Sequence, residues 1–169
     1  MTRRGSTLRF GLVVTSDRVS RGLARDEITP LARKLIEDEG HVLVYSVVVP
    51  NSVGLIRRAV LDAVSWSDVV LVTGGTGPGP RDLSIEAVGL VARKEVPGLG
   101  LFMAEESRAS VGDRALMSRS TGFVVGDSLV MVSPGALDAV EKALGILFKM
   151  APHAVRAIRG ASKWVHGCA

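Results

Sequence analysis

The sequence predicts one α/β domain with three layers: a mostly parallel sheet, helices on both of its faces and a small β-hairpin. The 169-residue chain has the size of a single domain with a continuous core. Apolar runs of strand length alternate with amphipathic stretches in its first half, the order typical of a doubly wound sheet. Because no repeat, low-complexity tract or linker divides the chain, we expect residues 1–169 to form one domain with a core at about 8–160.

The first strand and helix follow from residues 8–40. Residues 8–15 are a nearly unbroken apolar run, which suits a strand buried on both faces. Thr29 is a candidate helix cap with Pro30 at the first helical position, and Gly40 ends the helix. Residues 42–49 are rich in β-branched side chains and predict the second strand.

The next elements lead into an unusual loop. A second helix is expected to start near Asn51 or Ser52, and residues 69–73 predict a third strand. The Gly- and Pro-rich segment 73–80 follows that strand directly and precedes a helix for which Ser84 is the expected cap.

The second half of the chain predicts a hairpin and a long helix. The pattern at residues 99–117 is helical but irregular. Residues 122–125 and 128–132 flank Gly126 and Asp127, whose order favours a type II′ hairpin turn. After Pro134 and Gly135, the apolar spacing predicts a long amphipathic helix.

The composition limits the function classes. The net charge of +4 and the pI near 9.7 suit an anionic ligand, but the basic residues are scattered and lack interleaved aromatics, so we do not expect nucleic-acid binding. No apolar run is long enough for a signal peptide or a membrane span. The single cysteine, Cys168, suits a reducing compartment, and we expect a cytoplasmic protein. One Asn and no Gln is a composition found in thermophiles.

The segment 73–82 predicts a phosphate-handling loop. Its four glycines leave backbone amides uncovered and permit positive φ angles, so the amides can surround an anion next to a helix N-terminus. The segment is neither a Walker A loop nor a GxGxxG dinucleotide motif. The alternative is a tight strand-to-helix connection without a ligand.

Polar residues after the predicted strands are candidate ligands, because loops converge beyond the carboxyl ends of parallel strands. Asp82 ends the glycine loop, and Ser16 with Asp17 follows the first strand. Asp82 is a candidate Mg²⁺ ligand for a phosphate-transfer reaction, and Asp17 is a second candidate for ligand contact, with a simple turn at Ser16-Asp17 as the alternative. The alternative is that Asp82 caps a helix or pairs with Arg81.

These residues resemble the MoaB/Mog family of molybdenum-cofactor biosynthesis proteins. Residues 73–87 look like its Thr-Gly-Gly-Thr-Gly, Arg-Asp, Ser/Thr, Glu-Ala pattern. The other matching positions follow in the family's order: Ser16-Asp17, Gly22, Asp26, Pro97-Gly98, Glu106-Ser107, Met117-Ser118-Arg119, Gly122 and Pro134-Gly135. The resemblance implies molybdopterin binding and, in active members, use of ATP and Mg²⁺ to adenylylate its terminal phosphate with release of pyrophosphate. It also implies a homotrimer or homohexamer, and a molybdenum-insertion protein as a candidate partner.

The resemblance assigns roles to individual residues. Asp82 and Asp17 become the expected catalytic residues and tentative Mg²⁺ ligands. The expected substrate-binding residues are Ser16, Gly74, Gly75, Thr76, Gly77, Arg81, Ser118, Arg119, Pro134 and Gly135. Asn51 and Asp26 are candidates of uncertain role.

The sequence departs from the family pattern at three places. Asn51 stands where active members carry an Asp, and an amide brings no negative charge for a metal. The family's Ser-Gly after the first motif reads Ile28-Thr29, and its Pro-Gly-Asn/Ser-Pro loop reads Pro134-Gly135-Ala136-Leu137.

Three functions therefore compete. The first is a molybdopterin adenylyltransferase, and the second, motivated by Asn51, is a molybdopterin-binding protein without catalysis. The third is a nucleotide pyrophosphatase of the competence-damage type, ranked last because that domain tends to carry an acid where Arg81 stands.

Overall fold

A computed structural model of the protein describes residues 6–160, and within them the strands form one six-stranded sheet. The sheet order is β2-β1-β3-β6-β5-β4, in which β5 runs antiparallel to its neighbours β6 and β4 and the other pairings are parallel. The strands are β1 (Arg9–Thr15), β2 (Val42–Val49), β3 (Val69–Thr73), β4 (Lys94–Val96), β5 (Thr121–Val125) and β6 (Ser128–Ser133).

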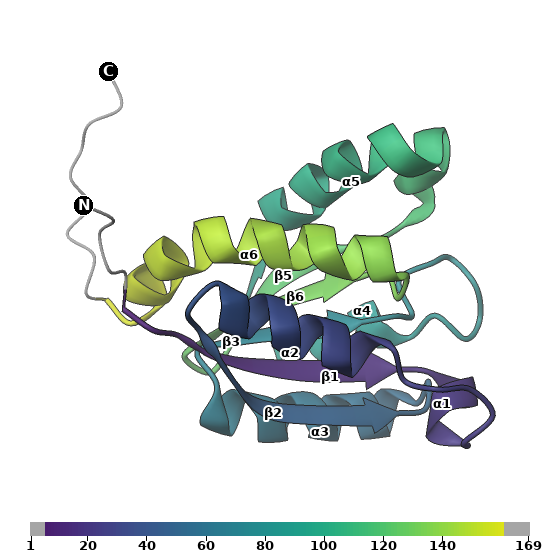
Figure 1. Cartoon of the computed structure of the whole chain (residues 1–169), viewed down its shortest axis with the longest axis horizontal. Helices are drawn as coiled ribbons and strands as arrows, with labels where there is room; N and C mark the ends of the chain where they lie inside the picture. Colours follow the sequence, from purple (N-terminus) through teal and green to yellow (C-terminus); the bar gives the residue numbers. More distant parts are fainter. Residues whose placement is uncertain (1–5, 161–169) are drawn as a thin grey trace.

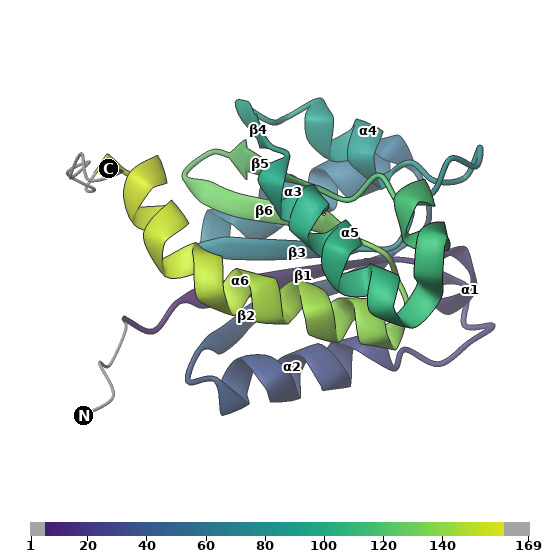
Figure 2. The same cartoon turned by 90° about the horizontal axis from the view of Figure 1, so that it is seen from above.

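Helices cover both faces of the sheet, so the predicted three-layer α/β fold is confirmed (Figures 1 and 2). One face carries α2, α5 and α6, and the other carries α3 and α4. The helices are α1 (Asp17–Ser20), α2 (Ile28–Asp38), α3 (Val53–Trp66), α4 (Ser84–Gly89), α5 (Gly98–Val111) and α6 (Leu137–Ile158), with a 3-10 helix at Gly112–Met117 after α5.

The predicted hairpin is confirmed, and it belongs to the main sheet. Strands β5 and β6 pair from Thr121↔Val132 to Val125↔Ser128. Gly126 has φ +56°, whereas no non-glycine residue among those described has positive φ, which excludes a type I′ turn. Strand β4 was not predicted, because its three residues include Lys94 and Glu95 and lie at the exposed edge of the sheet.

Two predicted helix caps were wrong. Thr29 lies inside α2, and the carboxylate of Asp26 caps that helix by accepting hydrogen bonds from the backbone N–H groups of Ile28 and Thr29, both at 3.0 Å. Ser84 is the first residue of α4, not its cap, and its hydroxyl lies 3.3 Å from the hydroxyl of Thr15.

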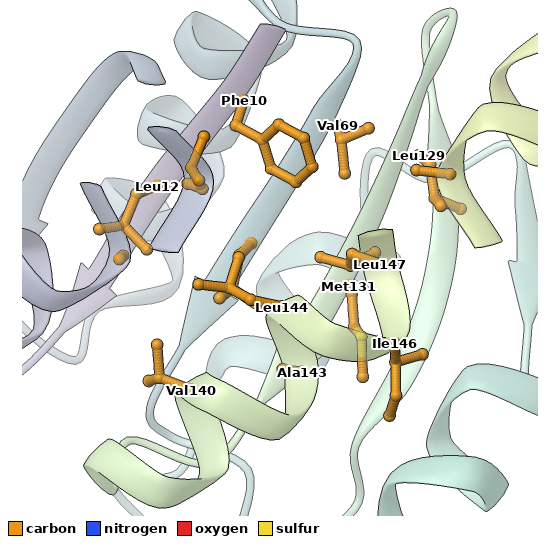
Figure 3. Close-up of a cluster of buried hydrophobic side chains, with 14 of the residues drawn as sticks. Phe10, Leu12, Val69, Leu129, Met131, Val140, Ala143, Leu144, Ile146 and Leu147 are labelled. Carbon is orange, nitrogen blue, oxygen red and sulfur yellow. The ribbon is translucent and has the colours of Figure 1, made fainter. Parts of the chain in front are cut away.

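The core has one hydrophobic cluster on each face of the sheet. In Figure 3, α6 lays Val140, Leu144 and Leu147 over strand residues that include Phe10 and Met131. The opposite cluster joins α3 and α4 to the sheet. Full burial of a side chain of this size contributes roughly 1.5–3 kcal/mol, so the sheet is a firm platform for the loops at its edge.

The carboxyl ends of β1, β2, β3 and β6 lie at one edge of the sheet, because these strands are parallel. The arrowheads of β1 and β2 in Figure 1 point to this edge, where α1 also lies. No helix in the described part of the chain is long and apolar enough to cross a membrane. Cys168 lies outside the described residues.

Candidate active site

The glycine loop leaves β3 through two residues that need glycine. Gly74 and Gly75 have φ angles of +99° and +65°, a conformation that other residues rarely adopt. A Cβ on Gly75 would also lie 2.6 Å from the hydroxyl oxygen of Ser84. The chain therefore turns back on itself directly after the strand, and the N–H of Ser84 donates to the carbonyl of Gly75 at 3.1 Å.

Hydrogen bonds join this loop to the neighbouring strand ends. The N–H of Gly74 donates to the carbonyl of Ser133 at 2.8 Å, and the hydroxyl of Thr73 donates to the carbonyl of Pro134 at 2.9 Å. The hydroxyl of Thr15, at the end of β1, donates to the carbonyl of Thr73 at 3.2 Å. The ends of three parallel strands are thus fixed relative to one another before any ligand binds.

The carboxylate of Asp82 folds back into the loop that it ends. Its Oδ2 accepts a hydrogen bond from the N–H of Gly79 at 2.9 Å. A Cβ on Gly77 or Gly79 would lie 2.6 or 2.8 Å from the same oxygen, so a larger residue at either position would displace the Asp82 carboxylate. The loop, and not a helix terminus, therefore determines where this carboxylate lies.

Asp17, the other predicted catalytic residue, joins three loops. Its Oδ2 accepts hydrogen bonds from Nε and Nη2 of Arg81 at 3.1 and 2.6 Å, and its Oδ1 accepts from the backbone N–H of Asn51 at 2.9 Å. The Arg81 guanidinium, followed by the N–H of Asn51, lowers the pKa of Asp17. Both carboxylate oxygens are thus bound within the chain, and Arg81 would have to release one before Asp17 could contact a metal through it.

Asn51 holds an unpaired oxygen beside the glycine loop. Within residues 6–160 its buried Oδ1 has no hydrogen-bond partner, and it lies 3.2 Å from the position that a Cβ on Gly75 would take. A buried acceptor left without any donor costs roughly 1–3 kcal/mol, so this oxygen is a position where water or a ligand can supply a donor.

Ser118 and Arg119 lie against the other side of the loop. The Ser118 hydroxyl donates to the hydroxyl of Thr76 at 3.2 Å, and the N–H of Arg119 donates to the Thr76 carbonyl at 2.9 Å. The Arg119 side chain also contacts carbonyl oxygens of the loop and the carboxylate of Glu86. Arg119, which the resemblance assigned to substrate, is thus engaged with the protein itself.

Two cavities open along this edge of the sheet. The first, of about 400 Å³, lies between the loop and α5 and has an apolar wall that includes Met103 and Ala115. Thr76, Gly77, Ser118 and Pro134 also line it. The second, of about 360 Å³, lies toward α1 and α2 and is lined by Ser16, Asp26 and Gly135 among others. Six of the ten predicted substrate-binding residues thus line one of these two cavities, whereas Gly74, Gly75, Arg81 and Arg119 line neither.

The geometry does not form a ready metal cage. Within residues 6–160, no three His, Cys, Asp or Glu side chains gather as a metal site. Mg²⁺ in phosphate-transfer sites is commonly held by one or two carboxylates together with substrate phosphates and water, which is the arrangement that Asp82 and Asp17 can offer. Two carboxylates could therefore hold Mg²⁺ only together with further ligands from a substrate or from water.

Comparison with known proteins decides the family. Residues 11–153 match the family model described as a probable molybdopterin binding domain. The chain belongs to this family. The resemblance to MoaB/Mog proteins is thereby confirmed.

Relatives of this molybdopterin binding domain carry related names. A Haemophilus influenzae protein named molybdopterin adenylyltransferase is 33% identical over 143 residues, which are 81% of this chain and 71% of that protein. A solved structure of the tungsten cofactor synthesizing protein MoaB from Pyrococcus furiosus superimposes with a TM-score of 0.81 at 30% identity, covering 91% of this chain and 98% of that one. The chain spans only 48% of a bifunctional molybdenum cofactor biosynthesis protein from Synechococcus elongatus, to which it is 33% identical over 154 residues.

Sequence reasoning missed two parts of this site. Glu86 belongs to the Glu-Ala portion of the family pattern, yet its contact with Arg119 was not predicted. The apolar wall from α5 and the following 3-10 helix was also missed, because its apolar side chains lie between the matching family positions in a stretch with only a weakly amphipathic pattern.

Proposed function

We propose that this protein acts in molybdenum cofactor biosynthesis by transferring the adenylyl group of ATP to the terminal phosphate of molybdopterin. A phosphate oxygen of the pterin would attack the α-phosphorus of ATP, the bond from that phosphorus to the bridging β-oxygen would break, and pyrophosphate would leave. The observation that carries the proposal is the pair of cavities that meet at the Pro134-Gly135 turn, the first of which is also lined by Thr76 and Gly77 of the glycine loop. The name of the Haemophilus relative supports the same chemistry.

The residues of the loop suit this role. The N–H of Gly74 is bound to the carbonyl of Ser133 and fixes the start of the loop, so the loop amides that follow it would surround a phosphate with little reorganisation. Asp82 and Asp17 would hold Mg²⁺ together with the phosphates, and the bound ion would neutralise charge that develops on the transferring group. Arg81 would stabilise the same charge once it leaves Asp17.

Asn51 motivates the second candidate, a molybdopterin-binding protein with little catalysis. Its amide oxygen is placed beside the loop but carries no negative charge for a metal. If a second acid is required there, the natural protein should transfer adenylate slowly and Asn51→Asp should raise the rate, with little change in pterin affinity.

The experiment compares single-turnover adenylylation by the natural protein and by Asn51→Asp at the same Mg²⁺ concentration, with pterin binding measured separately. Equal fast rates support the transferase and show that an amide at residue 51 does not limit the reaction. A slow natural rate that the variant raises supports a transferase limited by residue 51. No transfer in either, with pterin still bound, overturns the transferase in favour of the binding protein.

The third candidate, a nucleotide pyrophosphatase, has no observation of its own in its favour. Arg81 occupies the position where that class tends to place an acid, and it is paired with Asp17. We further propose that the protein is cytoplasmic, assembles as a homotrimer or homohexamer, and passes its product to a molybdenum-insertion protein. The bifunctional Synechococcus relative, which continues well beyond the matched region, supports a functional link to a second activity.

A further inference from the structure

Arg119 reaches across the mouth of the glycine loop. Its Nε donates to the carbonyl of Gly77 at 3.0 Å, and its Nη2 donates to the carbonyl of Asp82 at 3.0 Å. The same residue fixes a third point of the loop, because its backbone N–H donates to the carbonyl of Thr76 at 2.9 Å. One side chain therefore joins the two ends of the segment that closes around the Asp82 carboxylate.

Glu86 holds the guanidinium in that position. The carboxylate lies on α4, immediately beyond the loop, and pairs with both Nη1 and Nη2 of Arg119, the latter at 3.3 Å. Arg119 lowers the pKa of Glu86, and Glu86 raises the pKa of Arg119. The fork of a guanidinium suits this task, since it can serve carbonyls and a carboxylate together.

We propose that Arg119 and Glu86 form a strap that sets the shape of the glycine loop, so that Arg119 is a positioning residue for Asp82 and not a phosphate ligand. The part of this inference that concerns turnover rests on the proposed function. The carbonyls of Gly77 and Asp82 point toward the Arg119 guanidinium. Their partial negative charges are therefore turned away from an anionic substrate.

The second arginine of the site shows the contrast. Arg81 is 61% exposed and contacts one carboxylate, that of Asp17, whereas Arg119 is 38% exposed and contacts two carbonyls and Glu86. Release of Arg81 requires the loss of one ion pair, but release of Arg119 would also open the loop. We therefore assign the two arginines different roles: Arg81 is the one available to contact a substrate phosphate, and Arg119 stabilises the conformation of the loop.

Arg119→Lys and Glu86→Gln test the strap. Lysine keeps the charge but cannot span both carbonyls, and glutamine keeps the shape of Glu86 but removes its charge. In the protein without ligands, both variants should increase amide hydrogen exchange at Gly79, whose N–H donates to Asp82, and at residue 119, whose N–H donates to the carbonyl of Thr76. In adenylylation assays we expect kcat to fall by about tenfold or more, with KM for ATP changing by less than about threefold, because positioning acts on the reacting geometry.

Arg93→Lys and Asp127→Asn are the matched controls, because this exposed ion pair lies away from the loop. They should leave exchange at Gly79 and at residue 119, and the kinetic constants, unchanged. Melting temperatures identify any variant that loses its fold, and exchange is then compared below the transition.

The opposite result has a distinct form. If Arg119 were a phosphate ligand held back by Glu86, then Glu86→Gln would release it and tighten ATP or pyrophosphate binding, with loop exchange unchanged. That outcome would contradict the proposed strap. So would an Arg119→Lys variant whose amide exchange and kcat equal those of the natural protein. If the natural protein transfers no adenylate, the exchange measurement still tests the strap by itself, so the two proposals fail separately.

Discussion

Replacing Gly77 by alanine should remove activity at little cost in stability. The new Cβ would lie 2.6 Å from Oδ2 and 3.2 Å from Cγ of Asp82, so the carboxylate must move by about 1 Å to reach normal contact distance. It would lose its hydrogen bond from the N–H of Gly79. Because Asp82 is half-buried and water can replace part of that bond, we expect a loss of about 1 kcal/mol, or roughly 2–4 °C in melting temperature.

The effect on rate should be much larger. A displacement of about 1 Å in a reacting group can cost about 100-fold in rate. Calorimetry and single-turnover adenylylation measure the two effects. Gly145→Ala is the control, since among the described residues the added Cβ would meet no atom within 4 Å beyond its chain neighbours and the backbone of α6 itself, and alanine there should stabilise the helix by roughly 0.5–1 kcal/mol without changing activity. Full activity in Gly77→Ala would refute the claim that the loop places Asp82.

Three further outcomes are expected. Asp68 is buried and pairs with Arg9 at 2.9 Å and Arg159 at 2.6 Å. Asp68→Asn should lower the free energy of unfolding by about 2 kcal/mol, because the two arginines are half-exposed and water screens the pairs; urea unfolding measures this loss. The pKa of Asp68 lies below the ordinary 3.8, so this stabilisation should be present above pH 4 and decline as the pH falls, and Asp68→Asn should flatten that decline. His41 accepts the N–H of Leu8 at 3.3 Å, and burial lowers its pKa below 6.5 despite the opposing effect of Glu39. Stability should therefore fall as the pH drops through 6.5, and this step should vanish in His41→Gln when unfolding is measured between pH 7 and 5. Light scattering at micromolar concentration should report a homotrimer or homohexamer, and a monomer would contradict the proposed assembly.

The sequence was most informative where structure is local. Runs of β-branched residues specified β1, β2 and β3 within one residue of the predicted ranges, because burial in a parallel sheet leaves few alternatives. The wrong caps at Thr29 and Ser84 show the limit of local rules. Asp26, and not Thr29, accepts the free N–H groups at the start of α2. The hydroxyl of Ser84 contacts the hydroxyl of Thr15, a residue 69 positions away.

The site shows the same division. The glycine loop and the carboxylates at the strand ends were visible in the sequence, since their position after a strand determines where they lie. Their partners were not visible. Arg81 meets Asp17 across 64 residues and Arg119 meets a loop carbonyl across 42, so the distinction between a ligand-facing arginine and a structural one depends on tertiary contacts.

The most direct test of the account is a single-turnover reaction of the natural protein with molybdopterin, ATP and Mg²⁺, in which adenylylated pterin and pyrophosphate are both measured. Asp82→Asn is run beside it, since this change removes one charge and keeps an acceptor for the N–H of Gly79. We expect equal amounts of the two products from the natural protein, and a loss of about 100-fold or more in the variant with pterin binding retained. Product formed at the natural rate by Asp82→Asn, or no product from the natural protein at any Mg²⁺ concentration while pterin still binds, would contradict it.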